Sequence, residues 1–243
     1  QRNEIAVYRG TPEKLAQLSG FSSALPESLR WVDSIGGFVP SHVSEDLAIN
    51  RGLILTVRYG TTETGAVSAR VGHSEDWQNL GKPVEEDLVS IVDNEDKALP
   101  AGSQGKIKLL KRKRFLSSNE DQFFYPGDEG YIDDEGNLIV LGRTDEYINL
   151  PGIRLNLQQI ENELRVHFPN VEIAAVFNQE STELILAIQA EFELSIPMIE
   201  KQLKIDHPNL PFETQMINAI PKNQMGKIQR QKLLQQLRPS TNL

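Results

Sequence analysis

The sequence has no cysteine among its 243 residues, which excludes disulfide bonds, thiolate metal sites and cysteine nucleophiles. Its four histidines, at positions 42, 73, 167 and 207, lack the spacing of metal ligands, so a structural zinc site is not expected. No apolar run reaches the roughly 18 residues that a membrane-spanning helix needs. The net charge of −9 argues against a general nucleic-acid partner, which would require a basic face.

What is present suits a soluble protein, because 39% hydrophobic residues in a chain of this length can form one or two cores. The first residues, Gln1–Glu4, carry neither a signal-peptide pattern nor an initiator methionine. We therefore expect a cytoplasmic location. The missing methionine leads us to expect that the chain is a fragment.

The expected secondary structure changes twice along the chain, so that three regions can be distinguished. Residues 1–80 alternate between helix and strand, with a helix at Ser41–Ile49, for which Ser41 is a possible N-cap, and an apolar strand at Leu53–Val57. This alternation predicts a piece of a parallel α/β sheet. Residues 81–144 contain short strands separated by turn clusters and predict a β-rich, barrel-like part.

The third region begins at Asp145. Leu157, Ile160 and Leu164 recur at helical spacing, and strand-like segments follow. Residues 145–243 therefore predict a small α+β domain, so the expected fold class is α/β plus α+β. Residues 1–144 would then belong to a larger α/β domain.

A polar segment, Tyr59-Gly60-Thr61-Thr62-Glu63, follows the apolar strand. Ligands of open α/β sheets bind at the carboxyl ends of strands. Thr61 and Thr62 could donate to phosphate oxygens, Glu63 could ligate Mg²⁺, and the ring of Tyr59 could face a base. The alternative is a solvated, threonine-rich turn.

Two further segments carry charge beside turns or strands. Asp128 follows a Pro-Gly turn, where its carboxylate could accept ribose hydroxyls or could be a plain β-turn aspartate. Arg143 could add a second ribose contact, and Asp145 could act as a pivot. The alternative for these two is a surface ion pair.

Near the end of the chain, Pro221 to Arg230 places Lys227 directly after a glycine, on a loop ahead of a helix. A lysine in that position can reach a phosphate or a carboxylate as a compact charge. The basic run Lys111–Arg114 is interpreted as a solvated strand edge rather than as a nucleic-acid or localisation signal.

Taken together, these segments resemble the C-terminal half of adenylate-forming (AMP-binding) enzymes. Their motif sequences are most similar to those of acyl-CoA synthetases. The match covers Tyr59–Glu63, Gly127-Asp128, Gly142–Asp145 and Pro221–Arg230. The stretches Gly81–Pro83, Ile91–Asp93, Gly152–Arg154 and Ile160-Glu161 fit as well.

The resemblance implies an AMP-forming acid–thiol ligase. ATP would activate a small carboxylic acid as an acyl-adenylate, and coenzyme A, or the phosphopantetheine of an acyl carrier protein, would then accept the acyl group. Lys227, Thr62 and Glu63 would be catalytic, with Mg²⁺ on Glu63. Tyr59, Gly60 and Thr61 would bind the nucleotide.

The resemblance also implies that Asp128 and Arg143 bind the ribose and that Asp145 is the hinge of a mobile C-terminal domain. The Ser/Thr/Gly-rich phosphate loop of the family is absent, so the chain would need a missing N-terminal portion and would be inactive alone. Lys106, Pro126 and Asn149 depart from the family pattern. A loading enzyme for a carrier protein and a non-catalytic nucleotide-binding or regulatory relative remain the alternatives.

Overall fold

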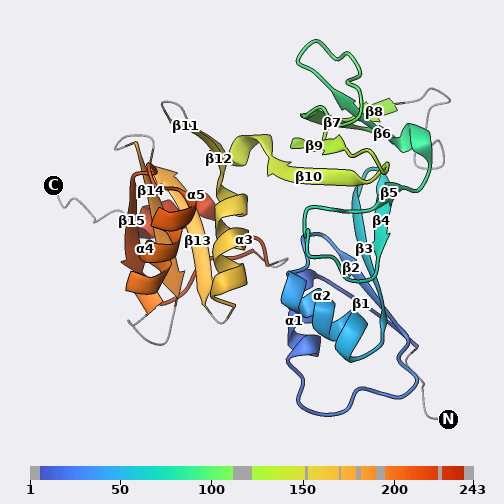
Figure 1. The fold of residues 1–243 in the computed structure, drawn as a ribbon, viewed down its shortest axis with the longest axis horizontal. Coiled ribbons are helices and arrows are strands. Elements are labelled where there is room, and N and C mark those ends of the chain that lie inside the picture. Colours follow the sequence, from blue (N-terminus) through green and yellow to red (C-terminus); the bar gives the residue numbers. More distant parts are fainter. Residues whose placement is uncertain are drawn as a thin grey trace. The chain divides into compact units, whose positions relative to one another are not determined.

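The computed structural model describes residues 6–111, 122–150, 153–169, 171–178, 182–189, 195–223 and 226–237. Its chain divides into two compact units, Gln1–Asp145 and Glu146–Leu243, coloured blue to yellow and yellow to red in Figure 1. That the first unit is part of a larger adenylation domain, and the second a mobile nucleotide-binding domain, stays a prediction.

The first unit begins with a mixed sheet. Three strands pair in parallel and two more are added antiparallel, in the order β1 (Val7–Gly10), β2 (Trp31–Ile35), β3 (Ile54–Thr61), β4 (Gly65–Val71) and β5 (Lys82–Pro83). The parallel strands are joined through α1 (Pro12–Ser19), α2 (Ser41–Glu45) and a π-helical turn (Asp46–Asn50).

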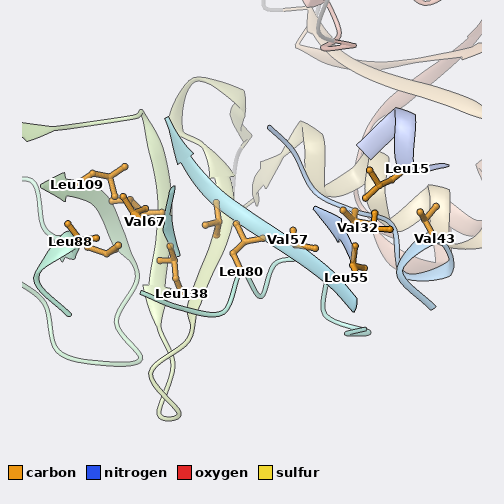
Figure 2. Close-up of a cluster of buried hydrophobic side chains, with 14 of the residues drawn as sticks. Leu15, Val32, Val43, Leu55, Val57, Val67, Leu80, Leu88, Leu109 and Leu138 are labelled. Carbon is orange, nitrogen blue, oxygen red and sulfur yellow. The ribbon is translucent and has the colours of Figure 1, made fainter. Parts of the chain in front are cut away.

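The helices cover one face of this sheet. Leu15 of α1 and Val43 of α2 pack on Val32, Leu55 and Val57 of β2 and β3 (Figure 2). All five side chains are almost fully removed from solvent. The apolar strand that the sequence predicted is therefore the centre of a real core.

The second sheet of this unit is antiparallel. Its strands are β6 (Val89–Val92), β7 (Gly105–Lys111), β8 (Gln122–Phe124), β9 (Asp128–Ile132) and β10 (Leu138–Arg143), with a 3₁₀ turn at Glu86–Leu88. The order is β10-β9-β7-β6, and β8 pairs with β7. Over the described residues this is an open sheet and not a closed barrel, so the predicted fold class is confirmed with an open β-rich part.

The second unit is an α+β sandwich. After a 3₁₀ turn at Thr144–Glu146, its elements are β11 (Tyr147–Leu150), β12 (Ile153–Asn156), α3 (Leu157–His167), β13 (Glu172–Asn178), β14 (Glu183–Gln189), α4 (Ser195–Asp206), β15 (Phe212–Met216) and α5 (Arg230–Leu237). β14 pairs antiparallel with β13 and parallel with β15.

Alternate residues of β13 and β14 face opposite layers. Ile173 and Leu184 belong to the cluster with α3 and α4, whereas Val176 and Ile185 belong to the cluster with α5. The helix predicted around Leu157, Ile160 and Leu164 begins at a true cap, because the Asn156 side chain accepts hydrogen bonds from the amides of Gln158 and Gln159.

Some local expectations were wrong. Ser41 is not an N-cap, because Pro40 takes that position and the Ser41 hydroxyl donates to the Glu75 carbonyl. The sequence patterns did not predict strands β1 and β4. None of the helices in the described part of the chain has the length and apolar character needed to cross a membrane.

Candidate functional site

The Tyr59–Glu63 segment forms the end of β3 and a tight turn into β4. The strand pairing shifts register between Tyr59 and Gly60. A Cβ atom at Gly60 would lie 1.9 Å from the Gly65 carbonyl oxygen, so only glycine permits this approach of the two strands. The segment is thus the end of a strand followed by a hairpin turn, which agrees with the alternative of a threonine-rich turn.

Two threonines close this hairpin. The hydroxyl oxygens of Thr61 and Thr64 lie 3.1 Å apart, and the Thr64 hydroxyl is 3.0 Å from the Gly65 carbonyl oxygen. Thr64 is buried, whereas Thr62 and Glu63 are exposed at the tip. The fold therefore presents Thr62 and Glu63 to solvent on a closed turn.

The Glu63 carboxylate accepts hydrogen bonds from its own backbone amide and from the Thr61 hydroxyl, which hold its pKa below the usual range. No group of three potential metal ligands occurs among the described residues. Mg²⁺ is commonly held by one or two carboxylates together with substrate phosphates, so the single carboxylate of Glu63 fits such an ion only alongside a phosphate ligand.

Tyr59 and Asp128, 69 positions apart, meet between the two sheets of the first unit. The Tyr59 hydroxyl donates to Oδ2 of Asp128 at 2.5 Å. Burial, and then the negative charge of Asp128, raise the pKa of Tyr59 well above its usual value. A carboxylate has about four lone-pair positions, so Asp128 can keep this bond and still accept ribose hydroxyls.

Arg143 ends β10 beside the same carboxylate. Its Nη1 lies 3.9 Å from Oδ1 of Asp128 and donates to the Pro126 carbonyl at 3.1 Å. Its Nε and Nη2 make a two-pronged pair with Asp145, at 2.8 and 3.0 Å. The surface ion pair between Arg143 and Asp145 is therefore present, while their ribose and hinge roles stay predictions.

Thr144 fixes the turn that carries Asp128. Its amide and its hydroxyl both donate to the Gly127 carbonyl, at 2.7 and 2.9 Å. Gly127 has φ +82°, a conformation that favours glycine, and a Cβ there would lie 3.2 Å from Arg143 Nη2. The Gly127-Asp128 turn is thus shaped by the residues just before the unit boundary.

Lys227 lies on a closed turn of the second unit. Its amide donates to the Asn223 side chain at 3.0 Å, and the Gly226 amide donates to the Asn223 carbonyl at 3.0 Å. Lys227 is exposed, and its ammonium group makes no ion pair with the described residues. The turn thus holds its backbone in a defined shape and leaves its charge in solvent.

The structure joins Tyr59, Asp128, Arg143 and Asp145 into one linked group in the first unit. Lys227 belongs to the second unit, so its approach to that group stays a prediction. Gly152 and Arg112–Arg114 fall outside the described residues. Sequence reasoning gave no role to Arg230 and Glu161, which form a partly buried ion pair, because their spacing along the chain does not show that they meet.

No protein-family model matches the chain. It is 30% identical over 222 residues to the mitochondrial acyl-coenzyme A synthetase ACSM4 of Rattus norvegicus, covering 80% of this chain and 38% of that protein. It is 26% identical over 274 residues to the D-alanine–D-alanyl carrier protein ligase of Bacillus cereus, covering 98% of this chain and 54% of that protein. The chain spans about half the length, or less, of the curated relatives it matches.

Solved structures share the fold. The anthranilate CoA ligase AuaEII with anthranoyl-AMP matches with a TM-score of 0.77 at 22% identity, covering 97% of this chain and 49% of that one. The O-succinylbenzoate coenzyme A synthetase of Bacillus subtilis with AMP matches with a TM-score of 0.72 at 21% identity, covering 96% and 51%.

Proposed function

We propose that this chain, which resembles the C-terminal part of adenylate-forming ligases in sequence and fold, works in an AMP-forming acid–thiol ligase. Such an enzyme activates a carboxylic acid with ATP, releases pyrophosphate and passes the acyl group to a thiol. The observation that carries the proposal is the group of Tyr59, Asp128 and Arg143, together with a separate exposed lysine on a closed turn.

The first unit supplies the nucleotide contacts. Asp128, held by Tyr59, accepts the ribose hydroxyls, and Arg143 assists. Thr62, with Gly60 and Thr61 beside it, contacts the phosphates, and Glu63 holds Mg²⁺ against them. The ion supplies charge neutralisation at the phosphates, which is the main need of phosphoryl chemistry.

The second unit supplies the mobile cation. Lys227 places its ammonium between the carboxylate of the acid and the α-phosphate, where negative charge gathers as the acyl-adenylate forms. Asp145 is the hinge about which residues 146–243 turn, withdrawing Lys227 before the thiol step. Exposure of the lysine on a preformed turn supports this role, because little ordering is needed when it engages.

The relatives support coenzyme A as the first choice of acceptor, since several of them are acyl-coenzyme A synthetases. A carrier protein is the second candidate, because one relative is a D-alanyl carrier protein ligase. Because the chain covers about half of these proteins, we propose that turnover also needs sequence equivalent to their N-terminal half.

ATP–pyrophosphate exchange tests the proposal, using this chain joined to its N-terminal counterpart and a panel of carboxylic acids. Lys227→Ala is expected to slow exchange about 10²–10³-fold, the usual cost of losing one preorganised charge contact. Lys222→Ala is the matched control, because Lys222 lies on the same turn and pairs with Glu172 at 2.7 Å. Exchange by Lys227→Ala at the rate of the unaltered protein contradicts the proposal.

The acceptor is tested separately by adding coenzyme A or a phosphopantetheinylated carrier protein to the accumulated acyl-adenylate. Rapid loss of the adenylate with coenzyme A alone supports the first choice, and loss only with the carrier supports the second. Nucleotide binding without any exchange indicates a non-catalytic relative and contradicts the ligase proposal.

A further inference from the structure

We propose that Arg230 is the positioning residue that joins the Lys227 turn to Glu146, the first residue of the second unit, through the core of that unit. The inference rests on the proposed function of Lys227. It assigns to Arg230 the task of making the lysine follow any movement about Asp145.

Arg230 begins α5, three residues after Lys227, and its side chain is 19% exposed. Its guanidinium reaches three different elements. Nη1 lies 2.5 Å from Oε1 of Glu161 on α3 and 2.7 Å from the Ala175 carbonyl oxygen on β13, and Nε lies 3.2 Å from Oε1 of Glu146.

Glu161 makes this contact a buried one. Its side chain is 2% exposed, and Oε1 also accepts the Ala175 amide at 2.8 Å. Burial by itself lowers the pKa of Arg230, but the carboxylates of Glu161 and Glu146 raise it overall, so the guanidinium stays charged. Removing one partner of such a pair leaves an uncompensated charge away from water, so breaking the contact carries a high free-energy cost.

The Lys227 turn closes on itself directly before Arg230. Lys222 and Ile228 form an antiparallel bridge, and the Gln229 amide donates to the Pro221 carbonyl at 2.8 Å. The turn is therefore a small unit whose end continues into α5. Apart from the half-exposed pair between Lys222 and Glu172 at the start of β13, its orientation depends on what holds the first residue of that helix, where Arg230 makes the polar contacts.

Only a guanidinium fits this arrangement. Its planar fork donates in several directions at once, whereas a lysine ammonium is a single point on a flexible stem. Arg230→Lys keeps the positive charge but cannot bond Glu146, Glu161 and the Ala175 carbonyl together. A displacement of about 1 Å at a reacting group can cost about 10²-fold in rate, so even a small loosening of the turn is measurable.

Hydrogen exchange on the 243-residue chain tests the structural part without any activity assay. In Arg230→Lys, the amides of Gly226, Lys227 and Gln229 are expected to exchange roughly tenfold faster or more, as the loss of one charged hydrogen bond predicts. The amides of β14 keep their protection. Lys222→Ala, which breaks a half-exposed pair with Glu172, leaves both sets unchanged.

Two results overturn this part. Equal protection of the turn in Arg230→Lys and in the unaltered chain shows that Arg230 does not hold it. Equal loss of protection in the turn and in β14 shows that Arg230 only stabilises the fold. If Arg230→Lys does not fold, Glu146→Gln replaces it, since Glu146 is 21% exposed and accepts a single hydrogen bond from Arg230, at 3.2 Å.

The kinetic part uses the ligase preparation of the exchange assay. Arg230→Lys is expected to lower kcat about 10–10²-fold while the KM for ATP changes less than about twofold, because the proposed ribose contacts belong to the first unit. Glu146→Gln lowers kcat less, and the two changes together are not additive because both remove the same contact.

Different results would contradict the proposed role of Lys227 and the proposed role of Arg230. An unaltered rate in Lys227→Ala removes the role of the lysine, while hydrogen exchange still reports whether Arg230 holds the turn. A slow Lys227→Ala beside an Arg230→Lys variant of unaltered kcat overturns the present inference alone.

Discussion

At the scale of single residues, the best-defined feature of the first unit is the contact between Tyr59 and Asp128. The tyrosine hydroxyl is withdrawn from water and faces a carboxylate at 2.5 Å, and both effects oppose loss of its proton. The hydroxyl therefore remains a donor that holds Asp128 in one orientation at every pH below the ordinary tyrosine pKa.

This contact predicts how the protein titrates in alkali. Tyr59 should stay protonated through pH 10, where a tyrosine of ordinary pKa is half ionised. Because the pKa of Tyr59 is raised by folding, its contribution to stability is complete below pH 10 and is lost as the pH rises above it. Absorbance of tyrosinate near 295 nm measures this, and Tyr59→Phe should leave the signal up to about pH 10 unchanged.

Asp128→Asn is the matched control for that titration. It keeps the shape of the side chain and removes the charge, so the pKa of Tyr59 should fall toward its usual value while staying above it because of burial. Ionisation of Tyr59 near pH 10 in the unaltered protein contradicts the contact.

Residue identities were easier to predict than residue partners. Asp128 and Tyr59 were each named from local patterns, but their contact spans 69 positions and depends on how two sheets pack. The Arg143–Asp145 pair was foreseen as an alternative because two positions separate the residues. Arg230 and Glu161, also 69 positions apart, gave no local signal that they would meet.

At the scale of elements, the sequence predicted those strands and helices that are marked by a continuous run or a regular spacing of apolar residues. The apolar run at Leu53–Val57 became β3, and the spacing of Leu157, Ile160 and Leu164 became α3. It did not predict β4 at Gly65–Val71, because the hairpin is specified by a backbone approach at Gly60 that no periodicity records.

That approach gives a prediction for the β3–β4 hairpin. Gly60→Ala would place a methyl group 1.9 Å from the Gly65 carbonyl oxygen, which is backbone and cannot rotate away. The strands must separate, and we expect the first unit to lose about 1–3 kcal/mol of unfolding free energy, as overpacking usually costs. Urea unfolding followed by tryptophan fluorescence measures it.

Gly20→Ala is the control for this change. Gly20 follows α1 with φ −71°, and a Cβ there would lie 3.5 Å from the nearest atom, an ordinary contact. Its stability should change by less than about 1 kcal/mol, toward greater stability. A Gly60→Ala variant as stable as Gly20→Ala would show that the hairpin tolerates a side chain.

At the scale of the whole molecule, the resemblance to the C-terminal part of adenylate-forming ligases is confirmed by relatives and by solved structures. The motifs could indicate it because they lie in matching order along nearly the whole chain.

Each unit has buried clusters of its own, and this arrangement predicts two unfolding transitions. One cluster includes Leu15 and Leu55 of the first unit, and the other two include Leu164 and Leu233 of the second. Domains with separate cores unfold as separate cooperative units unless an interface couples them. We therefore expect urea to unfold residues 1–145 and 146–243 at different midpoints.

The chain carries its own probes for the two transitions. Both tryptophans, Trp31 and Trp77, belong to the first unit, so their fluorescence reports on it alone. Among the described residues, most of those in helices belong to α3, α4 and α5, so far-ultraviolet circular dichroism follows mainly the second unit. The two curves should not coincide.

Core substitutions identify each curve. Leu55→Ala should lower the fluorescence midpoint through a loss of about 2–5 kcal/mol and leave the dichroism midpoint in place, because Leu55 is fully buried in the first unit. Leu164→Ala, buried in the second, should do the reverse. If either variant shifts both midpoints equally, the units unfold as one, and a C-terminal unit that moves independently about Asp145 becomes untenable.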